Sequence, residues 1–381
     1  MLQAPTSSTQ DHPPRDATRG RRRTPPISTG KLRLTRRAWL LLWLIAALIA
    51  VADGGLLLRG SRVTVVVEGR SRSLPAGLTV EQALRRLELP TMTGDLLAVD
   101  HTVLRKSAYP PRVLINGQPA PATRRLHRGD RVTVTPGRTR IEPVVRVIRQ
   151  LAASRPGNPI RSLVTGPAQA VLDRGRLSGR VMPVAFHPAG GSTGPLPVAL
   201  TFDDGPWPHT TAQILTILAQ QKAPATFFVV GRQVERYPDL VRQELAAGMA
   251  IGSHSYSHPQ PFDRLPAARI RDEIAWGRRT LQPLEIHPVG FRPPGGAVSA
   301  TVLATAQGLG ERTVLWSVDP ADWQPGVTAD QLVQRVLAVV RPGAIVLLHD
   351  GGGNRSATAA ALPAIIDGLR RLGLTLTVVP D

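Results

Sequence analysis

The C-terminal half of the chain alternates short apolar runs with longer amphipathic segments. Short runs rich in Val, Ile, Leu and Phe are typical of strands that are buried on both faces, whereas apolar residues spaced three and four apart predict helices. The predicted strands are residues 198–202, 225–230, 249–252, 314–318, 344–348 and 374–379. The predicted helices are residues 211–221, 239–247, 267–281, 329–340 and 359–371.

Strands that alternate with crossover helices predict a mostly parallel sheet covered by helices, so residues 196–381 belong to the α/β class. With about seven such units, the most economical arrangement is a distorted, closed or nearly closed (β/α) barrel. Functional side chains are then expected at the carboxyl ends of the strands.

The preceding part of the chain has a different pattern. Residues 62–68 alternate like a strand, residues 81–87 have a helical apolar face, and residues 113–115 and 131–135 are strand-like. This order predicts a small α+β unit over residues 61–138. It resembles the β-grasp fold of ubiquitin-like sulfur carriers and of small modules in bacterial wall proteins. The carriers end in a free Gly-Gly, which is missing here, so the resemblance implies a binding or spacer role.

Residues 139–195 contain a short apolar and basic segment, 144–151, followed by a stretch rich in Pro, Gly and Ser. This composition is typical of loops. We therefore expect a connector, with one helix packed against the unit that follows.

The N-terminus predicts export. Residues 1–37 are rich in Pro, Ser, Thr and Arg, which indicates a disordered basic tail on the cytoplasmic side. An apolar segment follows at 38–58, and a membrane span needs about 20 residues. We interpret it as a signal anchor of a single-pass cell-membrane protein whose catalytic part lies outside. The alternative is a secreted protein, with signal cleavage near Ala52.

Composition excludes several classes of site. The chain has no cysteine, which rules out disulfides, zinc–thiolate sites and a cysteine nucleophile. The formal net charge of +20 suggests nucleic-acid binding at first sight, but residues 196–381 hold sixteen basic and sixteen acidic residues. The excess lies in the tail and in the middle of the chain, so we expect no nucleic-acid partner.

Polar clusters follow the predicted strands. Asp203 and Asp204 end the first one, and adjacent buried carboxylates repel each other unless a cation relieves the repulsion. His254 and His258 are four residues apart, a spacing that suits a pair of zinc ligands. Taken alone, the first cluster also fits a solvated turn and the second fits two ordinary histidines.

Three more clusters come later in the chain. Arg292 lies in a Pro-Pro-Gly-Gly turn, where a fixed guanidinium can orient a carboxylate, although a lone loop arginine is more often a surface residue. Asp319, Asp322 and Trp323 follow another predicted strand. His349 ends an apolar strand, at a position that faces the pocket of a barrel.

Together the five clusters resemble the polysaccharide deacetylase (NodB-homology) family, also called carbohydrate esterase family four. The family order TFDDGP, H-(S/T)-x-x-H, R-x-P-x-G-like, D-x-x-D-W and L-x-H recurs here. The matching residues are 201–206, 254–258, 292–296, 319–323 and 347–349.

The resemblance implies a metal site. Asp204, His254 and His258 would bind a divalent cation, zinc first, with cobalt or manganese as alternatives. Asp203 would act as the general base for the attacking water. Arg292 would orient that aspartate.

The resemblance also implies the groups around the reacting amide. His349 would protonate the leaving amine, and Asp322 would hold it charged, with Asp319 as the alternative. A backbone N–H near Gly295 would stabilise the oxyanion. Some family members carry Tyr at this position, and Gly supplies the same N–H. Trp323 and Leu347 would line a notch for the acetyl methyl group.

The activity expected from this resemblance is removal of N-acetyl groups from a cell-surface polysaccharide. Export favours peptidoglycan N-acetylglucosamine as the substrate. Chitooligosaccharide or exopolysaccharide is the next candidate, and an O-acetyl ester of xylan comes last. A catalytically inactive wall-binding scaffold, with residues 61–138 as the working part, is the competing class. Because every ligand and base position is filled, we favour the enzyme.

Overall fold

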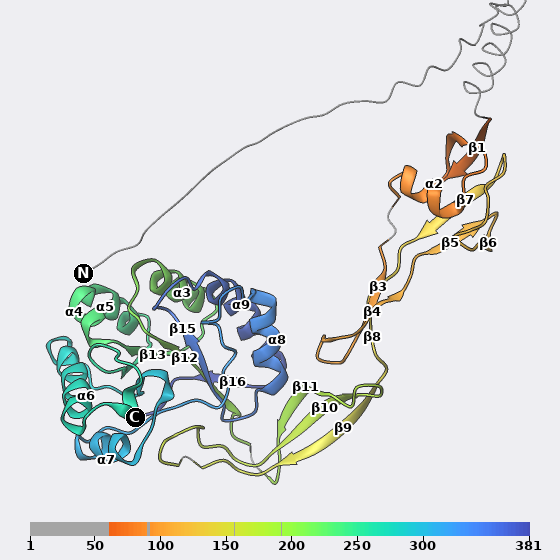
Figure 1. The fold of residues 1–381 in the computed structure, drawn as a ribbon. Coiled ribbons are helices and arrows are strands. Elements are labelled where there is room, and N and C mark those ends of the chain that lie inside the picture. Colours follow the sequence, from red (N-terminus) through yellow and green to blue (C-terminus); the bar gives the residue numbers. More distant parts are fainter. Residues whose placement is uncertain (1–60, 90–91, 156, 192) are drawn as a thin grey trace, which may run out of the picture.

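The computed structural model describes residues 61–381, except residues 90–91, 156 and 192 (Figure 1). The predicted tail and membrane anchor, residues 1–37 and 38–58, lie outside the described residues. Among the helices that the structure does describe, none combines the length and the apolar character that crossing a membrane requires.

The C-terminal unit is built on a five-stranded parallel sheet with the strand order β14-β13-β12-β15, and with β16 beside the start of β12. Its central strands are buried along almost their whole length. One face of the sheet packs against helices, and the other contributes Ala199, Phe228 and Ile345 to a separate apolar cluster inside the barrel. The strands are β12 (Pro197–Asp203), β13 (Thr226–Val229), β14 (Ala250–Ser253), β15 (Ile345–His349) and β16 (Thr375–Thr377).

Isolated parallel bridges continue the sheet around a ring. Ser253 of β14 pairs with Phe291, and Phe291 pairs with Thr313. A few residues later Val318 pairs with Val346 of β15, which brings the ring back to β12. The arrangement is a distorted barrel with five regular strands, fewer than the predicted number of units. The predicted strand over residues 314–318 is present only as these bridges.

Helices surround this barrel. The helices predicted from the apolar periodicity all form, and the one at Ala267–Leu281 begins and ends as predicted. The short α4 and the Ala- and Thr-rich α7 were not predicted, because their apolar periodicity is weak. The helices are α3 (Pro208–Gln220), α4 (Gly231–Arg236), α5 (Pro238–Ala246), α6 (Ala267–Leu281), α7 (Ala300–Gly308), α8 (Ala329–Val339) and α9 (Ser356–Arg371), with short 3₁₀ turns η1 (Phe262–Arg264), η2 (Gln282–Leu284) and η3 (Pro294–Gly296).

The N-terminal unit is a mixed sheet with the order β2-β1-β7-β5-β6 and one helix. Strands β1 and β7 pair in parallel at its centre, and a capping box between Thr79 and Gln82 starts the helix. Assignment to the β-grasp fold stays a prediction, which this strand order supports. The elements are β1 (Arg62–Val67), β2 (Arg70–Pro75), α2 (Val80–Arg86), β5 (Arg112–Ile115), β6 (Gln118–Pro119) and β7 (Arg131–Thr135).

One segment of the predicted module leaves this sheet. Strands β3 (Gly94–Leu97) and β4 (Val103–Tyr109) form a separate three-stranded sheet with β8 (Arg140–Ile141). Figure 1 shows this second sheet between the N-terminal unit and the rest of the molecule.

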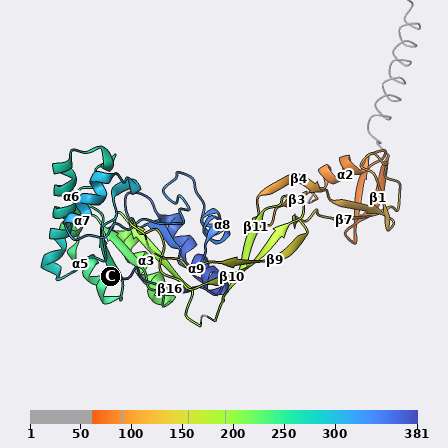
Figure 2. The same cartoon turned by 90° about the horizontal axis from the view of Figure 1, so that it is seen from below.

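The prediction of a connector with one helix over residues 139–195 is wrong in its secondary structure. Three strands form an antiparallel sheet there, and no described residue of this stretch is helical. The β-branched residues of 144–148, interrupted by Arg146, favour a strand over a helix. Leu172 and Phe186 of this sheet belong to the core of the C-terminal unit. Figure 2 shows the sheet beside α8. The strands are β9 (Val144–Leu151), β10 (Ala168–Gly175) and β11 (Val181–Pro188).

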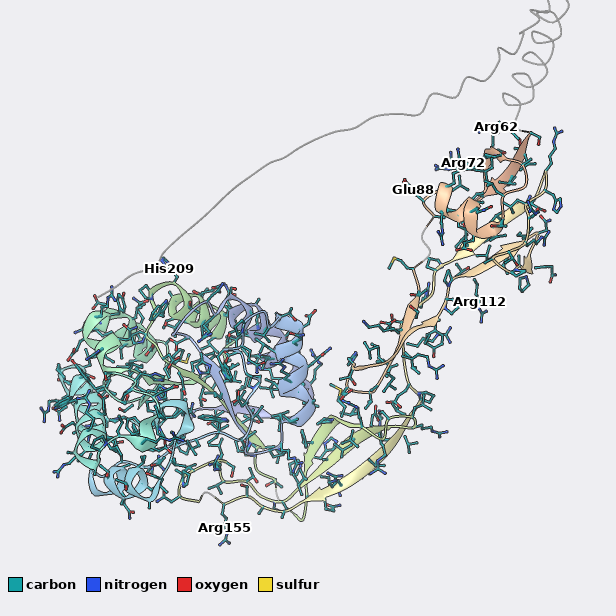
Figure 3. The ribbon with its side chains drawn as sticks, viewed as in Figure 1. Arg62, Arg72, Glu88, Arg112, Arg155 and His209 are labelled. Carbon is teal, nitrogen blue, oxygen red and sulfur yellow. The ribbon has the colours of Figure 1, made fainter. Side chains whose placement is uncertain are left out.

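The uneven charge has a structural counterpart. Basic side chains of the N-terminal unit, such as Arg62, Arg72 and Arg112, project into solvent (Figure 3). The apolar core of this unit shares no residue with the core of the barrel. The chain therefore combines a basic N-terminal part with an electrically balanced C-terminal part.

Candidate metal centre and active site

The carboxyl ends of β12 and β14 hold the first two predicted motifs. Asp203 is the buried last residue of β12, and Asp204 follows it with φ of 77°. Ser255 and His258, in the loop after β14, also have positive φ values of 62° and 56°. Non-glycine residues in this left-handed region are strained, and such strain is concentrated at functional sites.

These loops bring the three predicted metal ligands together. The Oδ1 atom of Asp204 lies 3.1 Å from Nε2 of His258 and 3.5 Å from Nε2 of His254. One ligand atom from each residue lies within 4.8 Å of the other two. Buried Asp204 Oδ1 accepts no hydrogen bond from the described residues, and a cation would satisfy it. The donor set therefore fits a divalent metal.

A hydrogen bond fixes the tautomer of His254. Its Nδ1 lies 2.7 Å from the carbonyl oxygen of Arg292, so Nδ1 donates its proton to that oxygen. The lone pair of Nε2 is then directed towards Asp204. Metal-binding histidines are commonly oriented in this way.

Glu273 of α6, which the motifs did not predict, holds the loop between the two histidines. The backbone N–H groups of Tyr256 and Ser257 donate to its Oε2 at 3.1 and 2.8 Å, and the Ser257 hydroxyl donates to Oε1 at 2.6 Å. Arg269 forms an ion pair with this fully buried carboxylate at 2.7 Å. The sequence signal was an acidic residue on the apolar face of a helix, beside Ile270 and Ile274.

Arg292 is fully buried and fixes one oxygen of Asp203. Its Nη1 donates to Asp203 Oδ1 at 2.7 Å and to the Thr201 hydroxyl at 2.8 Å. Nε and Nη2 donate to the carbonyl oxygens of Val314 and Leu315. These carbonyls bind a guanidinium rather than a neighbouring strand, which explains why the predicted strand at 314–318 is irregular. Asp203 Oδ2 remains 3.7 Å from Nε2 of His254.

The partly buried His349 pairs with the buried Asp322. The Nδ1 of His349 lies 2.6 Å from Asp322 Oδ1, and the backbone N–H of His349 donates to Oδ2 at 2.9 Å. Thr358 also donates to this carboxylate. Asp319 accepts a hydrogen bond from the N–H of Ala321 instead. Of the two acids considered for this contact, the geometry selects Asp322.

The environment raises the pKa of His349. Burial, the largest influence, lowers it, but the hydrogen bond and charge of Asp322 and the charges of Asp203 and Asp204 outweigh burial. Burial would likewise raise the pKa of Asp204, yet the neighbouring histidines hold it well below its usual range. The site therefore favours an ionised Asp204 and a protonated His349.

A pocket of about 340 Å³ collects these groups. Trp323 is half-exposed at its edge, Leu347 is buried, and Gly295 has φ of 64°. Arg292 and Asp322 do not line it and act from behind Asp203 and His349. The lining residues are Asp203, Asp204, His254, His258, Gln260, Gly295, Trp316, Asp319, Trp323, Leu347, His349 and Arg355, of which Gln260, Trp316 and Arg355 were not predicted.

The chain is similar to known proteins over about half of its length. The sequence profile of the family described as polysaccharide deacetylase matches residues 190–314. The chain is 42% identical over 187 residues to a peptidoglycan-N-acetylglucosamine deacetylase of Bacillus cereus, covering 48% of this chain and 86% of the relative. It is 41% identical over 206 residues to a chitooligosaccharide deacetylase of Bradyrhizobium sp., covering 50% of this chain and 93% of the relative.

Among solved structures, the chain resembles a family 4 carbohydrate esterase from Streptomyces lividans in complex with acetate. The TM-score is 0.45 at 34% identity, covering 48% of this chain and 97% of that chain. The identity to the curated relatives, over most of their length, shows that the chain is a deacetylase enzyme and belongs to the polysaccharide deacetylase family.

Proposed function

We propose that this enzyme removes N-acetyl groups from peptidoglycan N-acetylglucosamine with the help of a divalent cation. The observation that carries the proposal is one pocket that holds three convergent residues able to bind a metal, a fixed carboxylate and an imidazole whose pKa is raised. The peptidoglycan-N-acetylglucosamine deacetylase of Bacillus cereus supports the choice of substrate.

The cation would be held by Asp204, His254 and His258. Three protein ligands that leave positions open for water or substrate are typical of catalytic zinc sites, and cobalt and manganese are alternatives. Bound there, the metal supplies Lewis acidity, which polarises a carbonyl oxygen and makes water more acidic.

Asp203 is the general base in this proposal. Its Oδ1 is held by Arg292 at 2.7 Å, while Oδ2 faces the ligand cluster. The fixed carboxylate can therefore accept the proton of the attacking water at Oδ2. Arg292 cannot swing away because its other donors bind Thr201 and two backbone carbonyls.

His349 is the general acid. Asp322 holds its Nδ1, so Nε2 is the nitrogen that would deliver a proton to the departing amine. An amine leaves more readily once it is protonated. The N–H of Gly295 would stabilise the oxyanion, and Trp323 and Leu347 would contact the acetyl methyl group.

The remaining parts of the chain belong to the same proposal. We place the catalytic unit outside the cell, tethered by residues 38–58 or secreted after cleavage near Ala52. Residues 61–138 would be a β-grasp spacer between membrane and barrel.

The chitooligosaccharide deacetylase of Bradyrhizobium sp. favours a second candidate, deacetylation of chitooligosaccharide. An exopolysaccharide is the remaining polymer in this scheme.

The test is release of acetate from N-acetylated peptidoglycan and from chitooligosaccharide. We expect release that stops with a chelator and returns with zinc. Asp204→Asn should lose metal binding and turnover together, whereas Asp203→Asn should keep the metal and lose turnover. A protein that binds glycan but turns over no acetylated polymer with metal present would be the inactive wall-binding scaffold.

A further inference from the structure

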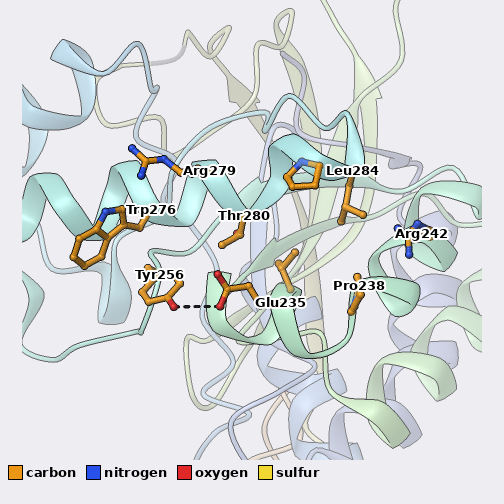
Figure 4. Close-up of a pocket in the computed structure, with 10 residues that line it drawn as sticks. Glu235, Pro238, Arg242, Tyr256, Trp276, Arg279, Thr280 and Leu284 are labelled. Atoms are coloured by element: carbon orange, nitrogen blue, oxygen red, sulfur yellow. Dashed lines mark hydrogen bonds between the residues drawn. The ribbon is translucent and has the colours of Figure 1, made fainter.

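A second pocket is lined by Tyr256, which lies between the two histidines in the chain (Figure 4). Its volume is about 580 Å³, and none of its lining residues lines the catalytic pocket. Helix α6 forms one side, α4 and α5 form the other, and Tyr256 closes one end. We call it the Tyr256 groove.

Two aromatic rings form one end of the Tyr256 groove. Tyr256 and Trp276 meet edge to face, with ring centroids 5.8 Å apart. Arg232 lies over Tyr256, and Arg269 lies over Trp276. Figure 4 shows that the apolar side chain of Leu284 lies further along the same groove. Aromatic and apolar walls with a few polar groups are characteristic of ligand-binding pockets.

The polar groups of the groove have free bonding capacity. The Tyr256 hydroxyl donates to Oε2 of Glu235 at 3.1 Å, and Oε1 of Glu235 accepts no hydrogen bond from the described residues. Arg279 has neither a hydrogen bond nor an ion pair within the described part of the chain, whereas Arg242 is paired with Asp239 at 2.6 Å. The groove thus offers one acceptor for a hydroxyl and one guanidinium for a carboxylate.

We propose that the Tyr256 groove binds a second segment of the substrate polymer, an N-acetylated glycan that carries carboxylate groups. The aromatic rings contact the apolar face of a sugar, Glu235 accepts from a hydroxyl, and Arg279 binds the carboxylate. This inference rests on the proposed function, because peptidoglycan carries carboxylates along its strands and uncharged chitin does not.

A polymer that occupies the groove and the catalytic pocket together gains apparent affinity. Binding at one site raises the effective concentration of the same strand at the other. The groove therefore contributes more to the binding of a polymer than to the binding of a short oligosaccharide. It also separates acidic from neutral glycans, which the catalytic pocket alone does not need to do.

Direct binding tests the chemistry of the groove. The full chain carrying Asp203→Asn is titrated calorimetrically with muramyl-containing tetrasaccharide and with chitotetraose. We expect Arg279→Ala in this background to weaken binding of the acidic fragment about tenfold and to change chitotetraose binding little. Arg371→Ala, an exposed arginine of α9, is the matched control. Equal affinities for both glycans in all variants would overturn the proposal.

Kinetics tests the role of the groove in the otherwise unchanged enzyme. Trp276→Ala and Arg279→Ala should each lower the ratio of kcat/KM on peptidoglycan to kcat/KM on chitotetraose about tenfold, while Arg371→Ala leaves this ratio unchanged. A parallel loss on both substrates would mean that the changes act through the histidine loop, and it would refute a polymer site. If the wild-type protein released no acetate, the proposed function would fail. The titration would still show whether the groove binds an acidic glycan.

Discussion

At the residue scale, Arg292 connects Asp203, the proposed general base, to the barrel. Its guanidinium lies over the ring of Phe228, 3.8 Å from the ring centroid, and it binds Asp203, Thr201 and two backbone carbonyls. A buried charge of this kind is stable only because its partners are complete. One side chain therefore determines both the position of Asp203, the proposed general base, and the packing of the irregular barrel segment.

We predict that Arg292→Met is strongly destabilising. It leaves Asp203 buried without its cation, and breaking a buried ion pair in this way lowers the free energy of unfolding by about 3–5 kcal/mol. Urea denaturation measures the loss. Arg242→Met, at an exposed ion pair, is the control and should lower it by less than about 1 kcal/mol. Equal losses would contradict a structural role for the Arg292–Asp203 pair.

The pair of His349 and Asp322 predicts a pH dependence. Because the pKa of His349 is raised, its protonated form persists to higher pH, and activity should fall as pH rises through that value. Asp322→Asn removes the charge that raises the pKa, so the alkaline limb of kcat should move down by roughly one pH unit or more. A pH–rate profile measures the shift. Asp319→Asn should leave the position of the limb in place, and an equal shift in both variants would argue against the pairing.

At the element scale, α6 supports the loop between His254 and His258. Glu273 accepts three hydrogen bonds from this loop, and α4 adds two more when the N–H groups of Gly231 and Arg232 donate to the carbonyls of Ser255 and Tyr256. A loop with strained residues needs such support to keep its ligands in place.

We predict that Glu273→Gln weakens metal binding about 10–100-fold, the usual effect of losing a group that orients a ligand. Titration of the metal-free protein with zinc measures it, and circular dichroism checks that the helix is retained. Asp272→Asn, the neighbouring acid on the same helix, is the matched control because Asp272 makes no hydrogen bond or ion pair with the described residues. Similar metal affinities in the two variants would show that the carboxylate does not position the loop.

At the scale of the whole molecule, two separate cores imply two cooperative units. The core of the N-terminal unit includes Val65, Leu84 and Ile115, whereas Phe202 and Phe227 belong to the core of the barrel. Among the described residues, the one cluster that could hold a metal ion lies in the barrel. A ligand stabilises the unit that binds it, by about 4 kcal/mol at a thousand times its Kd.

We therefore predict two transitions in differential scanning calorimetry of the full chain, of which a chelator lowers only the one that belongs to the barrel. Adding zinc back should restore its Tm. In Asp204→Asn, the barrel should unfold at the Tm of the chelator-treated wild-type protein, whether chelator or zinc is present. A chelator effect on both transitions would show that the two cores unfold as one.

Local sequence pattern was sufficient to predict most helices and strands of the barrel. Helix α6 was predicted to the residue, because apolar periodicity depends on neighbours three and four positions apart. The proposed metal ligands, the proposed base Asp203 and His349 lie at strand ends or in the loops that follow them, as the sequence pattern predicted. The sheet over residues 139–195 was missed, because its first strand, β9, is mostly exposed and Pro and Gly surround the other strands.

The sequence by itself determined which residue types are present, in which order, and on which kinds of element. Only the tertiary structure decided that Asp322 rather than Asp319 contacts His349, that Glu273 braces the loop, and that a groove lies behind Tyr256. These are contacts between residues far apart in the chain. They depend on how the barrel closes, and no local pattern carries that information.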